Sequence, residues 1–139
     1  MIGYTIDEMH VGQTASYAKT ITESDVYLFA GVTGDANPMH INEEYAKATR
    51  FGGRIAHGIL SAGLISAVMG MYLPGWGGIY LGQELKFLAP VRIGDTITAT
   101  AEVLELDKEK NRAVIRTYCT NQHGTVVTDG KAMVMPARA

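Results

Sequence analysis

The feature that most limits how this chain can fold is a stretch without any charged side chain, from residue 58 to residue 83. Its helix-compatible part ends near Leu73, because a proline and three glycines follow at once. About 16 residues at 1.5 Å each span only some 24 Å, which is less than the hydrocarbon core of a bilayer. The sequence therefore predicts a helix over residues 58–73 that is buried inside a protein and does not cross a membrane.

The second half of the chain has the pattern of β-strands. Apolar residues alternate with threonine or glutamate from Thr96 to Val103, which is the period of a half-buried strand. Turn-rich residues at 107–111 and 121–124 have the length of hairpin connections. We expect the last four strands to form an antiparallel meander. The predicted strands are residues 79–88, 96–103, 112–120 and 125–135.

The first half combines one extended segment, residues 14–20, with short helices. Thr22 can cap a helix over residues 23–32, and Asn42 can cap another over 43–48, with a loop at 34–38 between them. The whole chain, 1–139, then forms a single α+β domain in which a curved antiparallel sheet of about five strands wraps round one long apolar helix. The exposed edges of such a sheet favour pairing with a second copy, so we expect a homodimer or a larger homo-oligomer.

Residues 33–40, TGDANPMH, are the segment most informative about function. They place the carboxylate of Asp35, the carboxamide of Asn37 and the imidazole of His40 around a proline that prevents a continuous helix. A kinked loop can turn Asp35 and His40 toward one water, and such a pair suits proton transfer near neutral pH. Asn37 can fix that water or a substrate carbonyl. The same pattern also suits a simple turn in which Asp35 accepts hydrogen bonds from backbone amides, and the residues alone leave both interpretations open.

A second candidate element lies at the start of the predicted long helix, at Ala56-His57-Gly58. A helix N-terminus has unpaired N–H groups and a partial positive charge, and glycine lets a ligand oxygen approach its backbone. The Gly58 N–H could therefore stabilise negative charge that develops on a carbonyl oxygen. Tight packing at a helix start explains the glycine equally well. His57, next to it, is interpreted as a structural residue whose ring bonds the backbone, with a direct catalytic role as the lesser alternative.

Together these segments resemble the MaoC-like family of (R)-specific enoyl-CoA hydratases, whose fold is the hot-dog. Residues 33–40 match the family's hydratase signature, Gly-Asp-x-Asn-Pro-x-His. Residues 56–66, AHGILSAGLIS, look like the entry to the family's central helix, and residues 80–91, YLGQELKFLAPV, resemble the strand that follows it. The resemblance extends from about residue 11 to residue 135.

The resemblance implies a role for each matching residue. Asp35 and His40 would be the catalytic pair that shares the attacking water, and Asn37 would hold their geometry. The Gly58 amide would bind the thioester oxygen, while Ser66 would line the acyl tunnel, although packing in a small-residue helix accounts for Ser66 as well. Syn addition of water to a trans-2-enoyl-CoA would give the (3R)-3-hydroxyacyl-CoA. The resemblance implies no metal and no cofactor, with coenzyme A only as the carrier of the substrate.

Charge and cysteine content narrow the remaining function classes. The net charge is −2 with scattered basic residues, which argues against nucleic-acid and membrane partners. The single cysteine, Cys119, fits a reducing compartment, and the first residues do not have the pattern of a signal peptide, so we expect a cytoplasmic protein. Two alternatives stay open. One is a 3-hydroxyacyl-[acyl-carrier-protein] dehydratase or another hot-dog acyl-thioester enzyme, and the other is a non-catalytic module that binds acyl thioesters.

Overall fold

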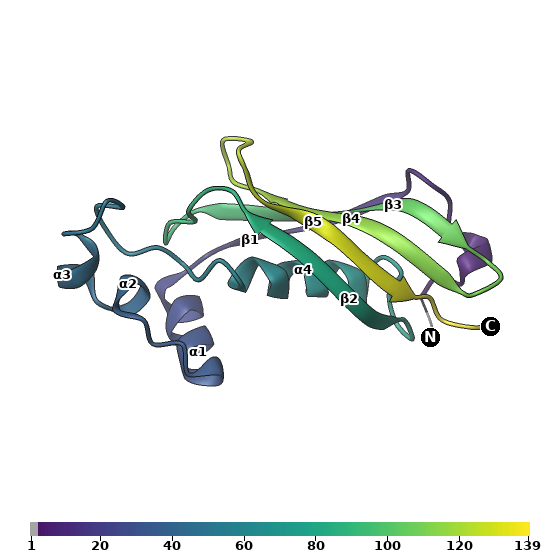
Figure 1. The fold of residues 1–139 in the computed structure, drawn as a ribbon, viewed down its shortest axis with the longest axis horizontal. Helices are drawn as coiled ribbons and strands as arrows, with labels where there is room; N and C mark the ends of the chain where they lie inside the picture. The colour runs from purple at the N-terminus through teal and green to yellow at the C-terminus, as the bar shows by residue number, and fades with distance from the viewer. Residues whose placement is uncertain (1–2) are drawn as a thin grey trace.

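A five-stranded antiparallel sheet that curves over one long helix dominates the structure, a computed structural model that describes residues 3–139 (Figure 1). The strands follow the order β1-β3-β4-β5-β2 across the sheet. The predicted α+β class and the predicted number of strands are confirmed. The strands are β1 (Thr14–Thr20), β2 (Ile79–Phe87), β3 (Thr96–Asp107), β4 (Arg112–Thr120) and β5 (Val126–Met135), and the helix beneath them is α4 (Leu60–Met71).

The predicted four-strand meander is wrong, because only β3, β4 and β5 follow one another as neighbours. Strand β2 pairs with β5 at the far edge, and β3 pairs with β1 instead. The eight residues 88–95 that follow β2 are longer than a hairpin loop and cross the end of the sheet. Along this path Leu88 donates to the Val127 carbonyl at 2.8 Å, and Val91 accepts from the Ala56 amide at 2.8 Å. The connector therefore also holds the segment that leads into α4.

The core lies between the inner face of the sheet and one side of α4. Alternate residues of β3 and β4 are buried, as the sequence period predicts. Helix α4 contributes Leu64, Ile65, Val68 and Met69 to this core. Its opposite side, which includes Gly63, Ser66 and Gly70, is exposed, so the sheet of one chain does not enclose the helix. None of the helices within residues 3–139 has both the length and the apolarity that crossing a bilayer requires.

Helices α1, α2 and α3 form an overhang beyond one end of the sheet (Figure 1). Helix α1 (Glu23–Thr33) starts at the predicted cap, where Thr22 and Asp25 bond each other's backbone amides. It ends at Gly34, whose φ of 84° is left-handed and suits glycine. Helix α2 (Pro38–Ile41) was not predicted, although proline at the first helical position is a known start signal. Helix α3 (Glu43–Ala46) ends two residues earlier than expected. A turn of 3-10 helix, η1 (Ile6–Glu8), precedes β1.

Candidate active site

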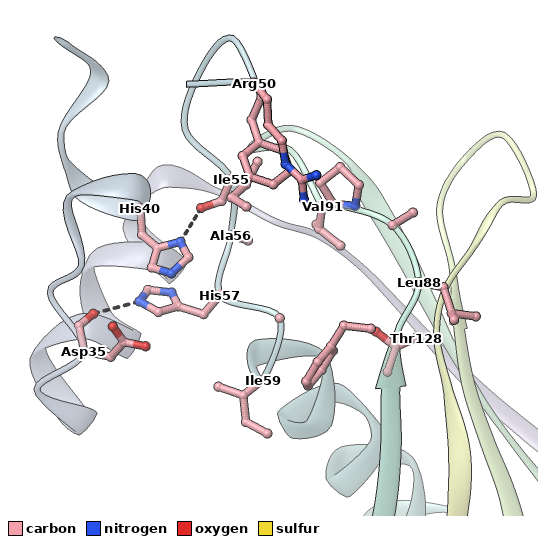
Figure 2. Close-up of a pocket in the computed structure, with 15 residues that line it drawn as sticks. Asp35, His40, Arg50, Ile55, Ala56, His57, Ile59, Leu88, Val91 and Thr128 are labelled. Atoms are coloured by element: carbon pink, nitrogen blue, oxygen red, sulfur yellow. Dashed lines mark hydrogen bonds between the residues drawn. The ribbon is translucent and has the colours of Figure 1, made fainter. Parts of the chain in front are cut away.

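A cavity of about 440 Å³ opens where the overhang, the approach to α4 and the connector after β2 meet (Figure 2). Asp35 and His40 line it from the overhang, and Gly58 lines it from the residues just before α4. Phe87 and Thr128 close the side formed by the sheet. Three of the predicted site residues therefore meet in one place, although they come from separate segments of the chain.

His40 lies in the last turn of α2 and is half-buried. Its Nδ1 donates to the Ile55 carbonyl at 2.7 Å, which sets the orientation of the ring. With its proton on Nδ1, the ring leaves Nε2 as an acceptor. The Ile55 amide in turn donates to the Met39 carbonyl at 3.3 Å, so two hydrogen bonds join α2 to the segment before α4.

Asp35 is exposed and sits in the loop between α1 and α2. Its backbone amide donates to the Thr33 hydroxyl at 3.1 Å, and its carboxylate accepts from the backbone amide of Asn37 at 3.4 Å. That second bond is the one the turn interpretation requires, but it is long. A carboxylate oxygen also lies within 4.8 Å of a ring nitrogen of His40. The loop therefore makes the turn and brings the carboxylate to the imidazole as well.

Asn37 caps α2 and does not line the cavity. Its Oδ1 accepts from the Met39 amide at 3.0 Å, and the first helical residue after it is Pro38. Because His40 belongs to this one short helix, the cap helps to set where the imidazole stands. Asn37 can therefore help to fix the position of His40 through the helix cap. It does not line the space that a substrate would enter.

Gly58 precedes α4, which begins at Leu60, two residues later than predicted. Within residues 3–139 its N–H meets no hydrogen-bond acceptor. The Ser61 hydroxyl donates to the Gly58 carbonyl at 2.7 Å and accepts from the Thr128 hydroxyl at 2.9 Å, which fixes the orientation of this residue. A Cβ here would lie 3.1 Å from the Phe87 ring, so glycine also suits the packing. Both interpretations of the glycine fit its surroundings.

Ser66 is not part of this cavity. It lies on the exposed side of α4 and lines a separate hollow of about 90 Å³. Met69 and Tyr80 border the same hollow, which lies between α4 and the start of β2. The structure therefore separates Ser66 from Asp35, His40 and Gly58, and both the tunnel role and the packing role of Ser66 stay predictions.

Arg54 anchors the overhang to the segment that carries Gly58. Its guanidinium donates to Glu23 of α1 at 3.0 Å, to Glu43 of α3 at 3.3 Å and to the Tyr27 hydroxyl at 3.1 Å. The hydrogen bond from Arg54 lowers the pKa of Glu23, which keeps that carboxylate charged. These bonds hold two overhang helices against one point near the cavity.

His57 also belongs to the candidate site, and the sequence did not predict that it lines the cavity. It lies directly before Gly58, is 2% exposed and lines the cavity. Its Nε2 donates to the Asp35 carbonyl at 2.8 Å, as the expected bond to the backbone requires. One donor atom each of Asp35, His40 and His57 lie within 4.8 Å of one another, and these are the side chains at this site that could ligate a metal. Their positions along the chain contain no signal for this grouping.

Comparisons with known proteins agree on one family. Residues 8–126 match the MaoC like domain. The chain is 58% identical to the (R)-specific enoyl-CoA hydratase of Rhodospirillum rubrum, over 99% of this chain and 96% of that protein. It is 51% identical to the 3-hydroxybutyryl-CoA dehydratase of Methylorubrum extorquens, over 92% and 81% of the two chains. The unliganded R-hydratase PhaJ1 of Pseudomonas aeruginosa superposes with a TM-score of 0.94 at 47% identity, over 99% of this chain and 88% of the other.

Proposed function

The chain belongs to the MaoC-like domain family with its hot-dog fold, and we propose that it is an (R)-specific enoyl-CoA hydratase. This hydro-lyase reversibly adds water to a trans-2-enoyl-CoA to give the (3R)-3-hydroxyacyl-CoA. The observation that carries the proposal is the one cavity shared by Asp35, His40 and Gly58. It brings together a carboxylate, an imidazole and a backbone N–H that no acceptor within residues 3–139 takes up, which are the groups that such an addition needs.

Asp35 and His40 act as the proton-transfer pair in this proposal. One water can bridge two acceptors up to about 5.5 Å apart, since each hydrogen bond is about 2.8 Å long. The Asp35 carboxylate and a ring nitrogen of His40 lie within 4.8 Å of each other, which is inside that reach. Its oxygen adds to C3 of the substrate while the pair removes one of its protons. The pair returns one proton to C2 on the same face, so the protons balance over the reaction.

Gly58 stabilises the charge that this addition creates. When the oxygen attacks C3, electrons move through the conjugated system onto the thioester oxygen, and an enolate-like anion forms. Gly58 lines the cavity, and its N–H has no acceptor among residues 3–139. A donor that is already in place costs no reorganisation at the moment of reaction, and loss of such a donor typically lowers the rate about 10²–10³-fold.

A hydration assay tests the proposed function. Purified protein is mixed with crotonyl-CoA, loss of the conjugated thioester absorbance is followed, and the product is coupled to dehydrogenases specific for each 3-hydroxy enantiomer. We expect reduction of the cofactor only with the enzyme for the (3R) product. Release of free CoA would instead indicate a thioesterase, and activity only on acyl-carrier-protein substrates would indicate the dehydratase alternative. No reaction at any chain length would favour a binding module.

The thiol of Cys119 is not suited to act as the nucleophile of a thioesterase. Burial raises the pKa of the Cys119 thiol to about 12, so the side chain stays protonated at neutral pH. The sulfur lies in the core and donates weakly to the Ser61 carbonyl at 3.9 Å.

We also propose that the active protein is a homodimer whose interface covers β2 and the open side of α4. Strand β2 is an edge strand, and it exposes Ile79, Tyr80 and Leu81 by 40–53%. The open side of α4 borders the start of this strand. An unpaired apolar edge beside an unpaired apolar helix is the kind of surface that a second copy of the chain covers.

Leu81→Lys should convert this dimer largely to monomer, because a charge at the apolar edge opposes its burial. Light scattering after gel filtration should give twice the mass of one chain for the wild type and close to one chain for the variant. Val11→Lys, which charges an apolar side chain that is 63% exposed outside this surface, is the matched control and should stay dimeric. A monomeric wild type, or a dimeric Leu81 variant, would contradict the proposed surface.

A further inference from the structure

His57 is a buried titratable group at the cavity that the mechanism above does not use. Its ring lies between Phe29, with centroids 4.6 Å apart, and His40, with centroids 3.9 Å apart. It is therefore in contact with one member of the proton-transfer pair and hydrogen-bonded to the backbone of the other. Figure 2 shows the two imidazoles together at the Asp35 end of the cavity.

The bond from His57 to Asp35 spans the gap between two separate parts of the site. The Nε2–H donates to the Asp35 carbonyl at 2.8 Å across 22 residues of sequence. Asp35 stands in an exposed loop, whereas His57 is buried and directly precedes Gly58. This bond therefore sets the distance from the carboxylate to the Gly58 amide, and the His40–Ile55 bond restrains the imidazole in the same way.

The other nitrogen of His57 argues against a purely structural role. Its Nδ1 is buried and has no hydrogen-bond partner among residues 3–139. An unpaired buried acceptor lowers the stability of the folded state, and an apolar side chain would fill the same space without that cost. Packing alone does not explain why an imidazole occupies this position, so the Nε2–H bond to Asp35 is the contact that accounts for it.

We propose that His57 is a positioning residue for the hydration reaction, acting through its Nε2–H on the Asp35 backbone. The inference rests on the proposed function, since it assigns Asp35 to the same chemistry. His57 holds the loop that carries the carboxylate at the correct distance from Gly58 and supports the face of the His40 ring. Displacement of a reacting group by about 1 Å can cost on the order of 10²-fold in rate, so a single restraint of this kind has a measurable effect.

Two amide variants of His57 distinguish the contribution of Nε2 from that of Nδ1. In His57→Gln the terminal amide nitrogen can reach the position of Nε2 and donate to the Asp35 carbonyl. In His57→Asn the shorter amide reaches only the position of Nδ1. We expect His57→Asn to lower kcat for crotonyl-CoA hydration at least about 10-fold with KM changed less than about 3-fold. His57→Gln should stay within about 3-fold of the wild-type kcat. Phe29→Leu, which removes the ring on the other side without touching the bond, is the packing control and should also stay within about 3-fold.

The outcomes are distinct. A wild-type protein without hydration activity would remove the proposed function itself. With an active wild type, a near-normal His57→Asn overturns the inference, and so does a His57→Gln that is as impaired as the asparagine variant. Should thermal denaturation show that His57→Asn does not fold, the glutamine variant alone decides, because a 10-fold loss there contradicts rescue through Nε2.

Discussion

Asp35→Asn should lower kcat for hydration at least about 100-fold while the protein keeps its fold, because the carboxamide can no longer take up a proton. The substitution is nearly isosteric, and its Oδ1 can still accept from the Asn37 amide. The loop should therefore keep its course, and only the chemistry should change. The measurement is kcat and KM for crotonyl-CoA, with the melting temperature as the test of folding.

The second variant is His40→Asn. Its side-chain amide can replace Nδ1 in the hydrogen bond to the Ile55 carbonyl, but no atom takes the place of Nε2. A loss of the same order is expected. Asp7→Asn and His123→Gln, at exposed positions away from the cavity, are the matched controls and should retain full activity. If either site variant hydrates crotonyl-CoA at close to the wild-type rate, the assignment of the proton-transfer pair is wrong.

Gly130→Ala should cause the largest loss of stability, at least about 2 kcal/mol in the free energy of unfolding. Gly130 lies in β5, opposite Leu85 of β2. A Cβ at this position would overlap the Glu84 carbonyl oxygen, which belongs to the backbone and cannot rotate away. Strand β2 must then move off β5, so its pairing and the packing beneath it are lost together.

Urea denaturation of the two proteins measures this change, and a fall of about 8 °C in melting temperature would accompany it. Gly82→Ala is the matched control, because Gly82 lies in the same strand pair and a Cβ there would meet no atom of residues 3–139 within 4 Å. The control should change stability only slightly. Equal stability of the two alanine variants would mean that β2 does not approach β5 as closely as the structure has it.

Local patterns in the sequence were sufficient for most of the secondary structure. The cap at Thr22, the alternation in β3 and the glycines after α4 each act over a few residues, so their effects can be read without knowing the fold. The signature at residues 33–40 is also local, and it led to the prediction that Asp35 and His40 form the catalytic pair. Helix α2 was missed because four residues are too few for a periodic pattern to emerge.

The order of the strands, the place of Ser66 and the part played by His57 depended on the tertiary structure. Backbone hydrogen bonds are similar whichever strand is the neighbour, so the path of residues 88–95 and the packing on α4 decide that β2 pairs with β5. Ser66 faces outward because one sheet covers only one side of its helix. The sequence by itself predicted which groups move protons. Only the fold brought His57 to Asp35, because the bond between them joins residues 22 positions apart.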